Sequence, residues 1–424
     1  MVGMRQRGTR ASRAYVCALV LGTALAVVFA PLAWPLGDAS ADPNSVAGPE
    51  SRSPSAGTLA LDPGDWDAQP DAFRGDWVVM QPWEYDKIPA LKEQNPDVRV
   101  LMYKDVTATV SDLCETGPTG KCDQDQEILP AGVGYWTTLR QNPEWFLRTE
   151  EGDILEWSDW PGLHPMDIAN PEYQQAWTDS VVGELEAHDW DGVMMDDALT
   201  RLSHPTFGDA VSPQVPDDAA MYAATTSFLS RVGPEITGAG YLAVPNVTVY
   251  EDNWRSTLEE WSPYVSGWEF EYLVKYGFGE EERFGTEDWR WRFDMISWAA
   301  EYDIPLLAVT YGTSYDEVAQ LYHRATWLLA WNGRTGASMY VPEESGVSFW
   351  LGPATADIGL PTEPVETVDG DVRLRRYSDG VAVVNSGDET RTVPLGGSYL
   401  SGIEAVDQVE LAPRSGAVLT TAGP

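Results

Sequence analysis

The feature that most constrains the fold is a regular alternation of apolar, strand-like runs with amphipathic, helix-like runs. The strand-like runs cover residues 76–86, 98–106, 163–167, 191–197, 241–249, 265–272, 304–312 and 335–341. The helix-like runs include 171–188, 216–236, 285–302 and 314–331. Strands that alternate with helices form right-handed βαβ units around a parallel sheet. About eight strands in roughly 270 residues fit a closed (β/α)8 TIM barrel better than an open doubly wound sheet.

The tail of the chain changes character. A Pro-rich connection precedes a period-two alternation of apolar and polar residues that contains an Asp379-Gly380 turn. This pattern is typical of antiparallel hairpins. We therefore expect an α/β barrel over residues 71–350 and a small antiparallel, β-sandwich-like domain over residues 351–424.

The N-terminal segment has the three parts of a secretory signal peptide. Four arginines precede an apolar run over residues 16–36, and "ASA" at 39–41 supplies the small residues of a cleavage site. We expect a signal peptide over 1–41, a flexible linker rich in Pro, Ser, Gly and Ala over 42–70, and a secreted product. An uncleaved membrane anchor is the alternative because the apolar run approaches spanning length, but Pro31 and Pro35 disfavour it.

The chain is strongly acidic, with a formal net charge of −39. Such a surface repels nucleic acid and anionic lipid, so we expect neither as a partner and no membrane association after signal cleavage. The simplest explanation for the acidity is solubility. The sequence does not indicate an oligomeric state.

Cys114 and Cys122 are separated by a short polar stretch and remain after signal cleavage. In an oxidising compartment such a pair is expected to form a structural disulfide. A metal site would need more ligands, and the chain has only four His. No Gly-x-Gly-x-x-Gly motif follows a strand and no Walker-type loop is present, so we expect no metal and no cofactor.

Acidic residues lie at the ends of two predicted strands. Asp196 and Asp197 end the fourth strand, and Glu269 and Glu271 end the sixth. Side chains alternate along a strand, and the aromatic residues between the two glutamates belong under the outer helices. Glu269 and Glu271 should therefore point into the barrel, with Glu271 nearer the rim, whereas alternation does not choose between the two aspartates.

In a (β/α)8 barrel the carboxyl ends of the strands surround one opening where catalytic residues lie. Two carboxyl groups across that opening are sufficient for glycosidic bond cleavage, since one protonates the leaving oxygen and the other attacks the anomeric carbon or activates water. We assign Asp196 as nucleophile or base and Glu271 as general acid, with Asp197 and Glu269 as further catalytic candidates. The alternative is that these acids only bond backbone donors or arginines.

Other strand ends carry polar or aromatic groups that could bind sugar hydroxyls or stack on sugar rings. The candidate substrate-binding residues are Trp83, Tyr103, Lys104, Asp167, Asn246, Tyr311 and, in the long loop before the first clear helix, Trp136.

Several longer segments carry a resemblance to a known family. They are, in chain order, "ALKEQNPDVRVLMYKDV", "HPMDIANPEYQQAW", "WDGVMMDD", "GWEFEYL" and the tail from "DIGLPTEP" to "LAPRSGAVL". Together they resemble hypothetical glycosyl hydrolase family 15, a group of TIM-barrel proteins with a following β-domain. The resemblance implies carbohydrate hydrolysis without naming a sugar. By position it matches the fourth-strand acid to Asp196 and the sixth-strand acid to Glu271, although the adjacent Asp197 and Glu269 leave both matches open.

The sequence thus favours a secreted glycoside hydrolase acting on a poly- or oligosaccharide. Two other hypotheses remain open. One is a barrel that binds saccharide without cleaving it. The other is an extracellular hydrolase that holds calcium or magnesium through Asp196, Asp197 and Asp167.

Overall fold

The computed structural model describes residues 56–60, 75–117, 120–158, 160–202, 211–279, 282–342 and 352–422. The signal peptide expected over 1–41 and most of the linker expected over 42–70 lie outside these residues. Within the described ranges, no helix combines the length and the apolar character needed to cross a membrane.

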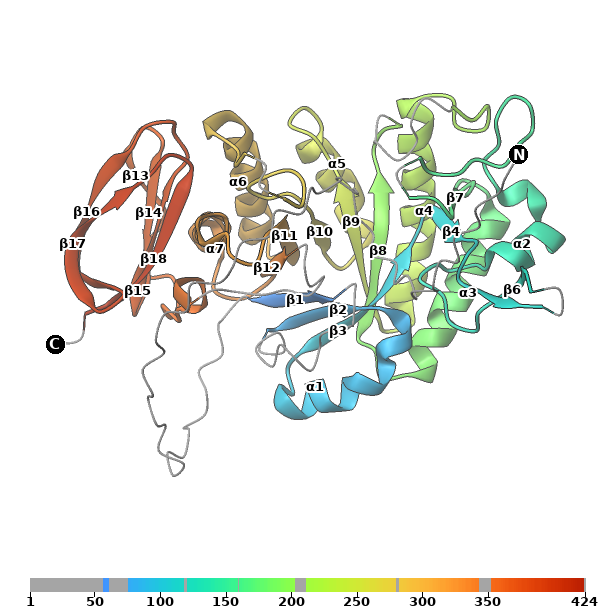
Figure 1. The fold of residues 1–424 in the computed structure, drawn as a ribbon, viewed down its shortest axis with the longest axis horizontal. Coiled ribbons are helices and arrows are strands. Elements are labelled where there is room, and N and C mark those ends of the chain that lie inside the picture. The colour runs from blue at the N-terminus through green and yellow to red at the C-terminus, as the bar shows by residue number, and fades with distance from the viewer. Residues whose placement is uncertain are drawn as a thin grey trace, which may run out of the picture.

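Eight parallel strands form a barrel in the middle of the molecule (Figure 1). Their order is β1 (Gly57–Ala60), β2 (Trp77–Met80), β3 (Arg99–Asp105), β8 (Gly192–Leu199), β9 (Leu242–Thr248), β10 (Trp268–Phe270), β11 (Leu306–Gly312) and β12 (Ala337–Pro342). A parallel bridge between Ala56 and Ser338 joins the first strand to the last. The predicted (β/α)8 barrel is confirmed.

Helices cover the outside of the barrel. They are α1 (Ile88–Gln94), α3 (Pro171–Ala187), α4 (Asp218–Gly238), α5 (Trp254–Trp261), α6 (Thr286–Glu301) and α7 (Glu317–Ala330), with the short 3-10 helices η3 (Pro82–Lys87), η6 (Ser262–Tyr264) and η7 (Gly352–Thr355). Asn170, Asp217 and Asp316 cap α3, α4 and α7, since each side chain accepts hydrogen bonds from backbone N–H groups of the first turn. These caps fix where each helix begins after its strand.

Two details of the predicted barrel are wrong. The first strand is β1 at 57–60, inside the segment expected to be a flexible linker, and all four of its residues are buried. The run 163–167, expected as the third barrel strand, instead provides β7 (Leu163–Pro165), which pairs antiparallel with β4 (Ala108–Val110) outside the barrel. The number of barrel strands is unchanged because one short strand replaces the other, so β8 and β10 are still the fourth and sixth.

The excursion between β3 and α3 forms one end of the molecule (Figure 1). Besides β4 and β7 it contains β5 (Cys114–Thr116), β6 (Cys122–Asp125), α2 (Tyr135–Gln141) and η4 (Pro143–Trp145). A disulfide joins Cys114 to Cys122 and ties β5 to β6, as predicted.

Apolar side chains fill the molecule in two main layers on either side of the barrel wall. Inside the barrel, Leu101, Val244 and Val309 belong to one buried cluster. Outside it, Trp268 and Phe270 belong to a larger cluster between the strands and the helices. Neighbouring residues of a strand therefore face opposite layers, which decides whether each strand-end acid points into the barrel.

The C-terminal part is a six-stranded antiparallel sheet at the opposite end of the molecule from α2 (Figure 1). Its order is β13 (Glu366–Asp369), β14 (Val372–Arg376), β15 (Gly380–Asn385), β18 (Ser415–Thr421), β16 (Arg391–Ser401) and β17 (Glu404–Leu411). The predicted antiparallel β-domain is thus present.

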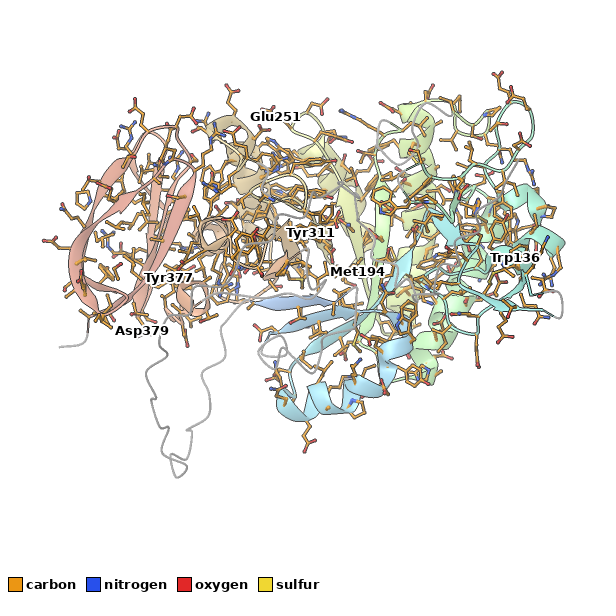
Figure 2. All side chains as sticks on the ribbon, viewed as in Figure 1. Trp136, Met194, Glu251, Tyr311, Tyr377 and Asp379 are labelled. Atoms are coloured by element: carbon orange, nitrogen blue, oxygen red, sulfur yellow. A yellow bond between two sulfur atoms is a disulfide. The ribbon has the colours of Figure 1, made fainter. Side chains whose placement is uncertain are left out.

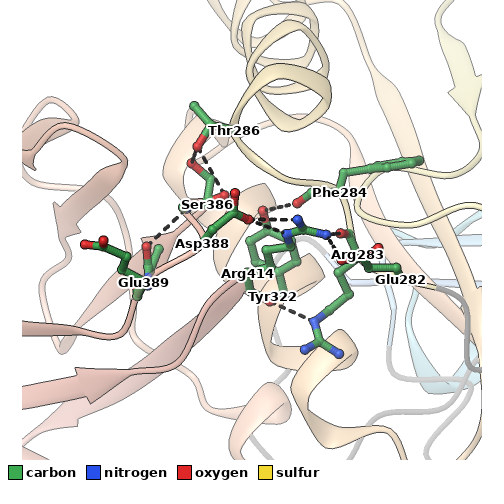
Figure 3. A network of polar contacts seen from close by, with 11 residues as sticks. Glu282, Arg283, Phe284, Thr286, Tyr322, Ser386, Asp388, Glu389 and Arg414 are labelled. Atoms are coloured by element: carbon green, nitrogen blue, oxygen red, sulfur yellow. Dashed lines mark hydrogen bonds and ion pairs between the residues drawn. The ribbon is translucent and has the colours of Figure 1, made fainter.

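A polar network joins this sheet to the barrel near the start of α6 (Figure 3). The Arg414 guanidinium donates to Asp388 at 2.8 and 3.0 Å and also contacts Glu282 on the barrel side. Arg283 returns a hydrogen bond of 2.8 Å to the Arg414 carbonyl, and Thr286 donates to the Ser386 carbonyl at 3.2 Å. The β-domain is therefore held against the barrel by reciprocal bonds.

Candidate active site

The two adjacent aspartates lie on a β-bulge at the end of β8. Met195 pairs with Pro245 and Ala198 pairs with Val247, so β8 has one more residue than β9 across this interval. Asp197 lies in this bulge and adopts a left-handed backbone conformation, with φ of 61°. Such bulges re-aim side chains at strand ends. The bulge places Asp196 in the barrel interior and leaves Asp197 half-buried beside it.

Asp196 is buried and accepts three hydrogen bonds. The Tyr103 hydroxyl donates to its Oδ2 at 2.6 Å, and the Asn246 amide and the Asp197 backbone N–H each donate to its Oδ1 at 2.9 Å. Burial raises the pKa of Asp196, while these three donors lower it by favouring the charged form. Three donors arranged around one carboxyl group favour an ionised Asp196.

Glu271 is the second carboxyl group of the site. It follows β10, is half-buried, and accepts a hydrogen bond of 2.5 Å from the Tyr311 hydroxyl. Burial and then the charge of Asp196 raise the pKa of Glu271 to about 7, against the opposing effect of hydrogen bonds from Tyr311 and Asn246. A carboxyl group with this pKa carries a proton at near-neutral pH and can donate it.

Asn246 on β9 connects the two acids, because its strand lies between β8 and β10. Its amide bonds Asp196 and also lowers the pKa of Glu271 through a hydrogen bond. The two carboxyl groups therefore share one neighbour in one opening. The pairing of Asp196 with Glu271 remains a proposal, since strand alternation alone did not choose between Asp196 and Asp197.

Glu269 lies deeper in the barrel. It pairs in register with Asn246 and is only 1% exposed, and among the described residues neither of its carboxyl oxygens has a hydrogen-bond partner. Burial, followed by the charges of Glu271 and Asp196, raises its pKa well above the ordinary value. Glu269 therefore lies beneath the acid pair in surroundings that favour its neutral form, and its depth disfavours a direct catalytic role.

Asp105, which the sequence offered only as a strand-end group that could bond a sugar hydroxyl, belongs to the same cluster of acids. It ends β3 opposite Asp196, and its Oδ1 accepts bonds from the backbone N–H groups of Thr107 and Ala108 at 2.7 and 2.8 Å. Its Oδ2 is buried without a partner, and burial together with the Asp196 charge raises its pKa well above the ordinary value. Strand alternation could have found it, since Asp105 shares the face of Tyr103.

The cluster of five acids, Asp105, Asp196, Asp197, Glu269 and Glu271, is not neutralised by neighbouring cations. In the described part of the chain, no lysine or arginine forms an ion pair with any of them. Burial raises the pKa of all five acids, and repulsion by neighbouring acids raises it further for each of them except Asp196. Asp197 is an example, because burial and the charges of its acidic neighbours raise its pKa well above the ordinary value.

Three of the predicted substrate-binding residues, Tyr103, Asn246 and Tyr311, contact the acid pair, but Lys104 does not. Its side chain points out of the barrel, where its ammonium bonds Glu184 at 2.7 Å and the Leu129 carbonyl at 2.5 Å. The prediction for Lys104 was wrong because neighbouring residues of β3 face opposite layers.

Asp167 and Trp136 belong to the excursion rather than to the barrel opening. Asp167 follows β7, and its Oδ1 accepts a hydrogen bond of 3.2 Å from the Ala169 N–H. Trp136 donates to the Ser111 carbonyl at 2.9 Å and lies at the far end of the molecule from Tyr311 (Figure 2). The structure therefore places neither residue beside the acid pair.

The remaining candidate, Trp83, is half-buried in η3, just after β2.

The metal-dependent hypothesis needed Asp167 beside Asp196 and Asp197, and the structure does not bring these three together as a metal site. Within the ranges described above, no three His, Cys, Asp or Glu side chains are grouped as a metal ion requires.

A family model decides the classification of the chain. The model for hypothetical glycosyl hydrolase family 15 matches residues 92–381, which is more than half of the sequence. The chain belongs to this family. The match to hypothetical glycosyl hydrolase family 15 covers β3 through β14 and includes both Asp196 and Glu271. No curated protein matches the sequence.

Solved structures of glycoside hydrolases resemble this member of hypothetical glycosyl hydrolase family 15 at low identity. The glycoside hydrolase domain of PelA from Pseudomonas aeruginosa is 14% identical, with a TM-score of 0.42 over 64% of this chain and 88% of that one. An alpha-amylase from Geobacillus thermoleovorans is 13% identical, with a TM-score of 0.43 over 84% and 90%. The Nostoc punctiforme debranching enzyme is 12% identical, with a TM-score of 0.44 over 84% and 88%. At these scores the likeness carries no argument about substrate or mechanism.

Proposed function

We propose that the chain is a secreted glycoside hydrolase. The O-glycosidic bond of its saccharide substrate is bound between the side chains of Asp196 and Glu271, which cleave it. The observation that carries the proposal is the shared Asn246, which connects two acids from strands on either side of β9 in a single barrel opening. The family and the fold support the reaction class.

The two acids lie in environments that favour different protonation states. Asp196 accepts three hydrogen bonds that stabilise its carboxylate, whereas the pKa of Glu271 is about 7. In this mechanism Glu271 donates its proton to the leaving oxygen, and Asp196 attacks the anomeric carbon or activates a water molecule. After the leaving group departs, the Glu271 carboxylate can accept the proton of an incoming water.

Secretion of the enzyme is supported by two observations. The N-terminal sequence has the order of a signal peptide, and the Cys114–Cys122 disulfide is of a kind that persists in oxidising compartments. The proposed partner is a carbohydrate outside the cell.

The test is reducing-end release by the mature chain from a panel of plant, fungal and bacterial polysaccharides. Asp196→Asn and Glu271→Gln should each lower turnover at least about a hundredfold while leaving the unfolding temperature close to that of the wild type. Glu301→Gln is the matched control, because Glu301 is an exposed acid at the end of α6. Full activity in both site variants would refute the assignment. Glycan binding without any release would instead indicate the non-catalytic saccharide-binding barrel.

A further inference from the structure

The segment that follows Glu271 carries aromatic rings in contact with one another. Phe278 lies 4.5 Å from Tyr311 between ring centroids, Tyr272 lies 5.7 Å from Tyr311, and Tyr276 lies 4.7 Å from Tyr272. Because the Tyr311 hydroxyl bonds Glu271, this series of rings begins at the proposed general acid. We call residues 272–278 the aromatic loop.

The aromatic loop is fixed to β11 by a buried lysine. The Lys275 ammonium is 0% exposed and donates to the carbonyls of Gly279 at 2.7 Å, Tyr311 at 3.2 Å and Gly277 at 3.3 Å. The Leu273 N–H also donates to the Val309 carbonyl at 3.0 Å. A buried ammonium that donates to backbone carbonyls of the loop and of β11 holds the loop in one conformation, so its rings are preorganised.

Tyr272 adopts a backbone conformation that non-glycine residues rarely use, with φ of 62°. The Arg292 guanidinium donates to its carbonyl at 3.1 Å and helps to hold it there. Strained residues of this kind cluster at ligand-binding and active sites. Besides burial, the charges of Glu271, Asp196 and Asp197 raise the pKa of Tyr272.

Tyr276 differs from the other rings because it is exposed. Its exposed fraction is 56%, although its ring contacts the half-buried Tyr272. An aromatic ring held rigidly at the surface beside an active site offers a flat apolar face, which suits the C–H face of a pyranose. The aromatic loop therefore leads from the acid pair to solvent through a series of tilted ring contacts.

The further inference rests on the proposed function, because it uses Glu271 as the general acid at the start of the series of rings. Glu271 protonates the leaving oxygen, so the departing part of the substrate lies on its side of the site. We propose that Tyr272 and Tyr276 form the binding platform for a leaving sugar unit, so that the substrate class is a saccharide chain rather than a glycoside with a small non-sugar leaving group.

The experiment compares two kinds of substrate in the full mature chain. The saccharide-chain substrates are cellohexaose, xylohexaose, mannohexaose, maltohexaose and chitohexaose. The substrate with a small leaving group is the fluoride of the corresponding disaccharide. Tyr276→Ala should lower kcat/KM on the cleaved hexaose about three- to tenfold, the range of one aromatic contact, with a clearly smaller loss on the fluoride. Tyr276→Phe should restore most of the loss because the ring and not the hydroxyl carries the contact.

Tyr302→Ala is the matched control, since Tyr302 is 59% exposed at the end of α6 and should leave both rates unchanged. If Tyr276→Ala lost kcat/KM equally on the hexaose and on the disaccharide fluoride, or lost none on either substrate, the proposed platform would be overturned. Calorimetry with the same hexaoses separates this outcome from failure of the proposed function. Binding that Tyr276→Ala weakens, in a chain that cleaves nothing, supports the platform and refutes only the hydrolase. A chain that neither binds nor cleaves any hexaose overturns both.

Discussion

At the scale of single residues, hydrogen bonding and burial act in opposite directions on each acid of the pair. Burial raises the pKa of Glu271, and the Tyr311 hydroxyl lowers it by bonding the charged form. Asp196 has three such donors and no neighbouring cation in the described ranges. In the proposed mechanism, the difference in donors, rather than in burial, separates the roles of these two similar side chains.

This balance predicts the effect of Tyr311→Phe on the pH profile. Glu271 acts as an acid only while protonated, so kcat/KM of the wild type should decline as the pH rises above about 7. Removing the hydroxyl removes a bond that lowers the pKa of Glu271, and the alkaline limb should therefore move to higher pH. The measurement is kcat/KM across the pH range, with Tyr302→Phe as control. An alkaline limb that moves to lower pH would contradict the assigned acid.

Glu269 predicts how stability depends on pH. Its pKa in the folded chain is raised well above 4.5, so between these values the unfolded chain loses a proton that the folded chain keeps. Stability should therefore fall as pH rises, with a slope of up to about 1.4 kcal/mol per pH unit for this one group. Glu269→Gln removes the titration, and in urea denaturation its free energy of unfolding should decline less than that of the wild type as the pH rises above the ordinary glutamate pKa. Exposed Glu301→Gln should keep the wild-type slope. An unchanged slope in Glu269→Gln would mean that Glu269 is ionised in the fold.

At the scale of elements, the sequence predicted the long helices α3, α4, α6 and α7 and the inward face of β10 because both follow periodic patterns, whereas the short helices α2 and α5 were missed. The aromatic residues on either side of Glu269 identified the outer face, and the structure places Trp268 and Phe270 there. The bulge in β8 was not predictable, because Val193, Met194 and Met195 are equally apolar and give no alternation. Strand β1 was missed since four small or apolar residues in a Pro- and Ser-rich stretch show no periodicity.

The bulge itself can be tested with two substitutions that both remove the Asp197 carboxylate. Asp197 has φ of 61°, which glycine adopts readily and alanine does not. Asp197→Ala should therefore be less stable than Asp197→Gly by about 1 kcal/mol, after allowance for the greater freedom of glycine in the unfolded chain. Urea denaturation of the two variants measures the difference. Equal stability would show that the end of β8 relaxes out of the bulge.

At the scale of the whole molecule, α7 belongs to both the barrel and the β-domain. From Ala319 to Ala330 every residue except Leu321 is buried, as expected for a helix covered on all sides. The β-domain also satisfies carbonyls at the end of α7, since Arg375 donates to the carbonyls of Leu329 and Trp331 at 2.9 and 2.6 Å. We therefore expect the barrel and the β-domain to unfold in one cooperative transition.

Gly416 on β18 lies directly against α7. A Cβ atom there would lie 2.7 Å from the Ala325 Cβ and 2.9 Å from the Leu321 carbonyl oxygen, so a larger side chain must push the helix away. Gly416→Val should cost about 1–3 kcal/mol of stability, measured by thermal or urea unfolding. Gly238→Ala in α4 is the control, because no atom lies within 4 Å of its added Cβ. Helix α7 packs against β11 and β12, and the ends of these strands border the opening that contains Tyr311. The loss of stability in Gly416→Val should therefore lower the temperature at which activity is lost as well as the temperature at which the structure unfolds. A Gly416→Val variant in which the β-domain unfolds first, while the barrel keeps its activity, would show that α7 does not couple the two parts.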